Sequence, residues 1–220
     1  MTGSGNLLLR GHNTSGTSTF TFGSTSFSGT VYMTANGGAV QVNAKGTEWQ
    51  NTVFDFTRNE DFSDSLIDST GSVPSAQTLS LSADTTVKGL ANGTAVATVS
   101  GAHILTLGTY EAQNYSYSGN LAANLSVNKT GSNTQTFTAA AELNAVSVGS
   151  GSLVFSNALT ANTLNLTGGS LTTGANVSLD TANLYGGSTW NLGADLTAAG
   201  TTFNIYDIAA GAITFAGEDV

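Results

Sequence analysis

The chain has 220 residues, which is enough for one large domain or two small ones with a buried core. Only 9% of the residues are charged and the net charge is −9. The sequence contains no run of lysine or arginine, so we expect neither nucleic acid nor an anionic membrane as a partner. The 40% apolar content excludes a disordered linker, and the absence of cysteine excludes disulfides and thiolate metal sites.

Residues 1–47 alternate between polar and apolar side chains. The alternation is strongest in STFTF (18–22), TVYM (30–33) and AVQV (39–42), with glycine and asparagine between these segments. Alternation of period two is typical of strands with one buried side, and the intervening residues favour turns. We therefore predict an N-terminal β repeat over residues 1–47.

Residues 48–77 break this pattern and contain six of the fourteen acids and the only proline. Asn59 is placed to cap a short helix, with Phe62 and Leu66 on one side of it. The sequence therefore predicts an irregular acidic insert loop over 48–77, with or without two helical turns.

Strand-like segments resume over residues 78–220, interrupted by one helix-like stretch at 139–143. The array is most regular at 163–214, where a thirteen-residue unit recurs four times: TLNLTGGSLTTGA, NVSLDTANLYGGS, TWNLGADLTAAGT and TFNIYDIAAGAIT. The second and fourth positions of each unit are apolar, and the first and third are polar.

A four-residue strand cannot bury its apolar side alone, whereas a stack of equivalent strands about 4.8 Å apart buries them all. The repeat thus predicts a β-solenoid in which Leu166, Leu179, Leu192 and Ile205 form one interior column. A hairpin meander is the alternative that gives regular spacing. Outward asparagines such as Asn165 are expected to bond to one another along the stack.

Residues 18–46 resemble the autotransporter-associated β-strand repeat of secreted bacterial passenger proteins. The resemblance depends on the alternating strand, on Phe27-Ser28-Gly29-Thr30 and on Gly38-Ala39-Val40-Gln41-Val42, with a weaker similarity at 133–157. It covers about a quarter of the chain. It implies a right-handed parallel β-helix, export to the bacterial cell surface, and a stalk or adhesive role.

The two ends of the sequence lead us to expect a segment of a longer protein. The start, MTGSGNLLLR, lacks the charged and apolar regions of a secretory signal, and AGEDV ends without a closing feature. No apolar run has the length of a membrane span.

Acids of the insert are the first candidate site. Asp55, Asp61 and Asp64 lie close together in sequence and could bind a ligand or calcium, which prefers oxygen ligands. The spacing matches neither an EF-hand nor a calcium-binding nonapeptide, so no cofactor is required. The competing interpretation is a solvated acidic loop.

Asp68 and Asp180 are the second candidate site. Asp68-Ser69-Thr70-Gly71 and Asp180-Thr181-Ala182 each follow an apolar strand end and are similar to the two aspartate loops of pepsin-like proteases, in which paired aspartates activate a water. Paired acids could equally hydrolyse a glycoside. The alternative function is thus a hydrolase acting on glycoprotein, and whether the chain is an enzyme stays open.

Together these features predict an all-β, right-handed parallel solenoid with an irregular acidic insert. The expected function is structural or adhesive, on the bacterial surface or after secretion. Expected partners are host glycans or glycoproteins and neighbouring cell surfaces. Self-association is also expected, because uncapped end coils offer strand edges for pairing.

Overall fold

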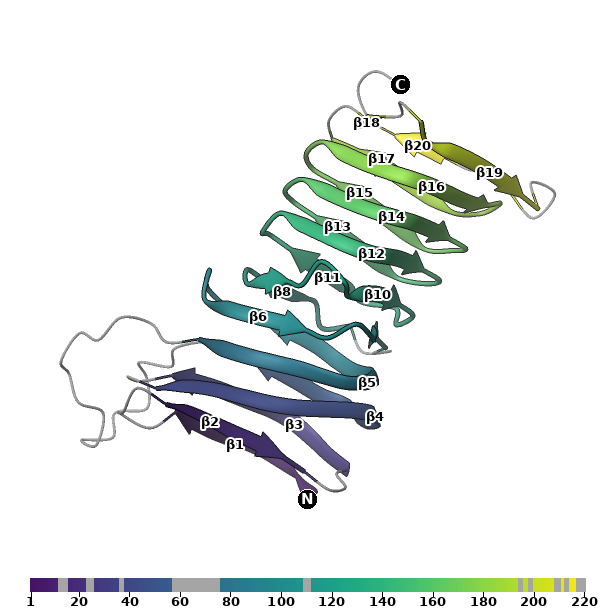
Figure 1. Ribbon diagram of the computed structural model, residues 1–220. Coiled ribbons are helices and arrows are strands. Elements are labelled where there is room, and N and C mark those ends of the chain that lie inside the picture. The colour runs from purple at the N-terminus through teal and green to yellow at the C-terminus, as the bar shows by residue number, and fades with distance from the viewer. Residues whose placement is uncertain are drawn as a thin grey trace.

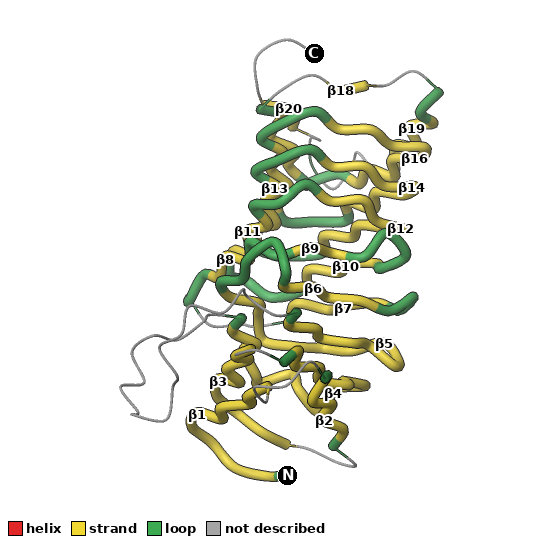
Figure 2. Tube along the Cα trace, turned by 60° about the vertical axis from the view of Figure 1, so that its left-hand side comes forward, coloured by secondary structure: helices red, strands yellow, loops and turns green. Residues whose placement is uncertain are grey.

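The computed structural model shows the predicted solenoid (Figure 1). It describes residues 1–11, 16–22, 26–35, 38–56, 76–108, 112–193, 196–197, 200–207, 211 and 214–216. Parallel strands stack as a right-handed solenoid of about eight turns. Within those ranges the chain forms strands, turns and loops but no helix (Figure 2).

The strands differ in length between the two halves of the chain. The N-terminal strands are β1 (Thr2–Gly11), β2 (Thr17–Thr21), β3 (Ser26–Ala35), β4 (Ala39–Asp55), β5 (Gln77–Ala91), β6 (Ala97–Ser100), β7 (Ile104–Leu107), β8 (Tyr115–Tyr117), β9 (Asn120–Leu121) and β10 (Ser126–Lys129). The later strands are β11 (Thr134–Phe137), β12 (Ala141–Val148), β13 (Ser152–Phe155), β14 (Leu159–Leu166), β15 (Ser170–Thr173), β16 (Val177–Tyr185), β17 (Thr189–Leu192), β18 (Leu196–Thr197), β19 (Thr202–Tyr206) and β20 (Thr214–Ala216).

All pairings between these strands are parallel, which excludes the hairpin meander for the part of the chain that is described. The larger sheet runs from β1 through β3, β4, β5, β7, β10, β12, β14 and β16 to β18, and the smaller from β8 through β11, β13, β15 and β17 to β20. Successive rungs follow one another along the stack from the N-terminal to the C-terminal strands (Figure 1).

Each coil has three faces, as β12 and β13 illustrate. In β12 the buried residues are Ala141 and Leu143, then Val146 and Val148, so the alternation changes phase at Asn144. The strand therefore bends there and contributes to two faces. Residues equivalent to 141–143 form the first face, those equivalent to 145–148 the second, and those equivalent to β13 the third. The prediction of a helix-like stretch at 139–143 was wrong, because residues 141–143 belong to strand β12.

The N-terminal coils use fewer and longer strands for the same path. Strand β4 pairs with β5 along most of its length, with register shifts on either side of Gly46 and Trp49. These irregularities mark the two bends, so β4 and β5 each pass over all three faces. Strand β4 also shows that residues 48–55 are strand and not loop, although they fall within the predicted insert. Because β4 bends, its buried residues do not follow strict period two, and the sequence pattern did not identify residues 48–55 as a strand. The proposed helix cap at Asn59 lies outside the described residues.

Aromatic side chains fill the core beneath the third face. Phe56, Tyr117, Phe137 and Phe155 follow one another along the stack, with successive ring centroids 5.0, 6.3 and 5.3 Å apart. All four are buried. In-register stacking of equivalent positions thus produces the continuous core that no single short strand could form.

The predicted thirteen-residue coil was wrong, although the solenoid was right. Strand pairs such as Leu159 with Val177 and Ser170 with Thr189 show that a coil here takes 18 or 19 residues. Segments 163–166, 176–179, 189–192 and 202–205 lie on the second, first, third and second faces, in that order. The same polar-apolar tetrapeptide recurs on every face, and thirteen residues advance the chain by two faces.

The predicted interior column is therefore distributed over three columns. Leu166 pairs with Leu184, which pairs with Ile205, on the second face, but Ile205 is exposed and is not an interior residue. Leu179 lies beside Ala161 on the first face, and Leu192 beside Thr173 on the third.

Replacing Gly151 by alanine is expected to destabilise the fold by about 2 kcal/mol or more. Gly151 has a φ of 67°, and an added Cβ would lie 2.0 Å from the carbonyl oxygen of Gly131 in the adjacent turn. Gly149→Ala is the matched control, since its Cβ would meet nothing closer than 3.7 Å. Urea denaturation followed by circular dichroism measures both variants. Equal stability of the two would contradict the expected backbone clash.

Candidate functional site

Outward asparagines form hydrogen-bonded ladders along the second face. The Nδ2 of Asn204 donates to the Oδ1 of Asn183 at 2.8 Å, and the Nδ2 of Asn183 donates to the Oδ1 of Asn165 at 2.7 Å. The Nδ2 of Asn165 continues the ladder to the Oγ of Ser147 at 3.3 Å. The expected bonding between stacked asparagines is thus confirmed. The resulting surface is polar, neutral and regular.

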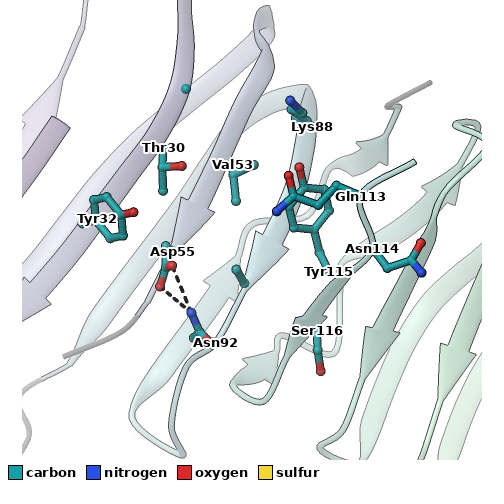
Figure 3. Close-up of a pocket in the computed structure, with 12 residues that line it drawn as sticks. Thr30, Tyr32, Val53, Asp55, Lys88, Asn92, Gln113, Asn114, Tyr115 and Ser116 are labelled. Atoms are coloured by element: carbon teal, nitrogen blue, oxygen red, sulfur yellow. Dashed lines mark hydrogen bonds between the residues drawn. The ribbon is translucent and has the colours of Figure 1, made fainter. Parts of the chain in front are cut away.

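A polar hollow of about 380 Å³ lies on the outer side of the third face, in the N-terminal half (Figure 3). Strands β3, β4 and β5 form its floor and one wall with Gly29, Thr30, Tyr32, Val53, Asp55, Lys88 and Ala91. The segment around β8 forms the opposite wall with Gln113, Asn114, Tyr115 and Ser116, and Asn92 completes the lining.

Small residues at two outward positions of β5 create the hollow. Tyr32 pairs with Asp55, and Asp55 pairs with Ala91, so side-chain size falls along this column. In the neighbouring column Val53 pairs with Gly89. A Cβ on Gly89 would lie 2.3 Å from the ring of Tyr115, which shows that this ring covers the glycine. Any larger residue at position 89 would push the ring away.

The wall that carries Tyr115 is fixed to β5 by a buried glutamine. The Oε1 of Gln135 accepts from the backbone N–H of Leu90 at 3.1 Å, and its Nε2 donates to the Leu90 carbonyl oxygen at 3.0 Å. Gln135 pairs with Tyr115 through the β11–β8 ladder. The Gln135 side chain therefore forms the two hydrogen bonds to the Leu90 backbone that a neighbouring strand would otherwise form. In this way it links the two walls of the hollow.

Asp55 is oriented by Asn92 from the next coil. The Nδ2 of Asn92 lies 2.9 Å from Oδ1 and 3.0 Å from Oδ2 of Asp55 (Figure 3). Asn92 itself has a φ of 58°, a left-handed conformation that asparagine tolerates better than most residues. Its backbone N–H donates to the carbonyl oxygen of Ser116 at 2.7 Å, and its carbonyl accepts from Ser118 at 2.8 Å. The carboxylate is thus presented by a rigid support.

The structure describes two of the five predicted aspartates, Asp55 and Asp180. Asp61, Asp64 and Asp68 lie outside the described residues. Asp55 lies at the end of β4, on the hollow, and Asp180 lies exposed on β16. Six strand steps separate β4 from β16 in the sheet, or roughly 29 Å at ~4.8 Å a step. Paired carboxylates of hydrolases lie about 5 to 10 Å apart at most, so these two do not form such a pair.

No group of three or more histidine, aspartate or glutamate side chains that could hold a metal ion occurs among the described residues. The nearest feature is an exposed pair on adjacent coils, in which His103 Nδ1 lies 3.8 Å from Asp84 Oδ1. The same carboxylate oxygen accepts from the backbone N–H of Ile104 at 2.9 Å. This pair links two coils, and calcium binding stays a prediction for the acids of the insert.

The sequence prediction missed most of the hollow. It singled out Asp55 but not Asn92, Tyr32, Lys88 or Tyr115, which come from segments far apart in the chain. A usable signal was the sequence Gly89-Leu90-Ala91-Asn92, where small residues alternate with a buried one and a turn former follows.

The part of the chain that is described contains no helix long and apolar enough to cross a membrane. The resemblance to autotransporter repeats stays a prediction, since nothing in the structure identifies that family. Comparisons with protein-family models, curated proteins and solved structures find no match for this chain.

Proposed function

We propose that the protein is a structural and adhesive solenoid, secreted or displayed on a bacterial surface, that binds host glycans or glycoproteins. The observation that carries this proposal is the combination of a parallel stack with a regular polar exterior. The exterior bears asparagine ladders and one oriented carboxylate in a hollow.

A parallel solenoid suits a display role for a physical reason. Each coil contacts only its neighbours, so the stack extends in one direction and keeps its width. The backbone hydrogen bonds run along the stack and resist bending between coils. Side chains on the outer faces are therefore held in regular rows at a distance from whatever anchors the chain.

Glycans are the partner class that best fits these rows. Sugar hydroxyl groups are neutral and both donate and accept hydrogen bonds, as do the amides and hydroxyls of Asn, Ser and Thr. The net charge of −9 disfavours polyanionic partners. Recognition would depend on many weak, directional contacts, which repetition along a stack can combine.

Binding of the protein to an immobilised mucin-type glycoprotein tests the proposal. We expect saturable binding that persists at about 0.5 M salt, because salt screens interactions between charges and the sugar hydroxyl groups carry none. Enzymatic removal of the glycans is expected to abolish it. Equal binding to the glycosylated and deglycosylated forms of the glycoprotein, or no binding to either form, would contradict the proposal. Cleavage of the glycoprotein that is lost in Asp180→Asn would instead favour the hydrolase. Self-association through the end coils stays a prediction, checked by sedimentation velocity.

A further inference from the structure

We infer that the polar hollow binds a single neutral sugar ring, with Asp55 accepting hydrogen bonds from adjacent ring hydroxyl groups. The inference rests on the proposed function, because it assigns the glycan partner to one site. It also names the chemical class of ligand, a neutral six-membered ring with neighbouring hydroxyls.

The size of the hollow fits such a ring. The hollow has a volume of about 380 Å³ and opens to water on one side. This volume lies in the range of about 300 to 1,000 Å³ that is usual for small-ligand sites. A ring that filled the hollow would displace the water in it.

The charges that line the hollow favour a neutral ligand. Its lining has one carboxylate, Asp55, and one ammonium group, Lys88, so the two formal charges cancel. A phosphate site would need an excess of cationic donors. A site for an organic cation would combine aromatic faces with acids and would not include a lysine. Amides and hydroxyls supply the remaining polar groups, which are the partners that a polyol requires.

The acceptor in the hollow is already ordered before a ligand arrives. Asn92 holds both oxygens of Asp55, and backbone hydrogen bonds to Ser116 and Ser118 hold Asn92. A ligand therefore meets a carboxylate whose orientation costs little further entropy. The left-handed φ of Asn92 is the local conformation that directs its side chain from one coil to the next.

Two tyrosines lie on opposite sides of the hollow, of which Tyr32 is partly exposed and Tyr115 is buried. Tyr32 lies beside Asp55 on β3, and Tyr115 lies across the hollow with Gln113 and Asn114 (Figure 3). Tyr32 offers an apolar ring face together with a hydroxyl, which matches the mixed C–H and O–H surface of a sugar. The structure thus provides a ring face, an oriented acceptor and amide groups around the hollow.

Saturation-transfer NMR with the purified 220-residue chain tests the inference. The probes are the methyl glycosides of glucose, galactose, mannose and N-acetylglucosamine, with inorganic phosphate and choline as charged comparisons. We expect at least one glycoside to bind, and phosphate and choline not to compete with it. Asp55→Asn is expected to weaken that binding by at least about tenfold, because a charged acceptor is lost.

Ala91→Leu is the second variant, because it fills the hollow and leaves every polar group in place. It should abolish binding, whereas Asp180→Asn, an exposed aspartate on another face, should leave it unchanged. Circular dichroism checks that each variant is folded. If Ala91→Leu does not fold, the binding measured for Asp55→Asn tests the inference by itself. Failure of every glycoside to bind, or equal binding by Asp55→Asn and the unmodified chain, would overturn the inference. Glycoprotein binding that survives both variants would overturn it as well and leave the proposed function standing.

Discussion

Replacing Phe137 by alanine is expected to lower the free energy of unfolding by about 3 to 5 kcal/mol. Phe137 is only 2% exposed and lies between Tyr117 and Phe155 in the aromatic column beneath the third face. Truncation removes ring contacts with both neighbours and leaves a cavity that the rigid coils cannot close. Urea denaturation followed by circular dichroism gives the change in stability.

Thr136→Ala is the matched control for this variant. Thr136 is the preceding residue of β11, points outward and is partly exposed, so its loss should change stability by no more than about 0.5 kcal/mol. Because repeat proteins can unfold a few coils at a time, hydrogen exchange at the β11 and β13 amides is a second readout. Similar effects of the two variants would show that the aromatic column contributes little.

Replacing Lys129 by methionine is expected to stabilise the protein by up to about 3 kcal/mol at pH 7. Lys129 is fully buried in the second face, beside Leu107 and Val148, and its ammonium group donates to the Gly131 carbonyl oxygen. Burial lowers the pKa of Lys129 from 10.5 to about 8. At pH 7 the folded state therefore contains a poorly solvated positive charge, which methionine of similar length avoids.

The stability of the unmodified protein should accordingly rise between pH 8 and pH 10. In this range folded Lys129 loses its proton while the unfolded lysine keeps it, so the unfolded state binds more protons and raising the pH favours folding. Above about pH 10 the trend reverses, because burial raises the pKa of Tyr117 and only the unfolded tyrosine ionises readily. Thermal melts at intervals from pH 7 to pH 9.5 measure the rise.

The rise with pH should disappear in Lys129→Met and persist in Lys45→Met, where the lysine is exposed. Lys45→Met also controls for the loss of one positive charge in an acidic protein. Parallel pH profiles for all three proteins would contradict a buried, titrating Lys129.

Local alternation was enough to predict the class of fold. Leu164 and Leu166 are buried while Asn165 lies between them on the surface, as period two requires. The same reasoning anticipated the bonded ladder from Asn165 to Asn204. It failed at Trp49 and Phe54, which are fully buried core residues inside the predicted insert. Bends in β4 change the phase of alternation there, and a search for strict period two does not detect a bent strand.

The candidate site was much less predictable than the fold. Asp55 attracted attention as one of several acids, yet its role in the structure depends on Asn92, 37 residues away, and on the small side chain of Ala91. A hollow is a property of neighbours in adjacent coils. Its position follows from the register between coils, and register was the part of the prediction that was wrong.

The sequence by itself determined that these segments form strands with leucine and phenylalanine inside and asparagine outside, because side-chain alternation assigns each residue to one side of a strand. Only the tertiary structure decided how many strands make one coil and which residues become neighbours between coils. The tetrapeptides 163–166, 176–179 and 189–192 share one polar-apolar pattern, so the pattern cannot distinguish the face on which each lies. The face on which each tetrapeptide lies depends on where the chain bends between strands. Those bends depend on core packing and turn geometry, which involve residues from several coils at once.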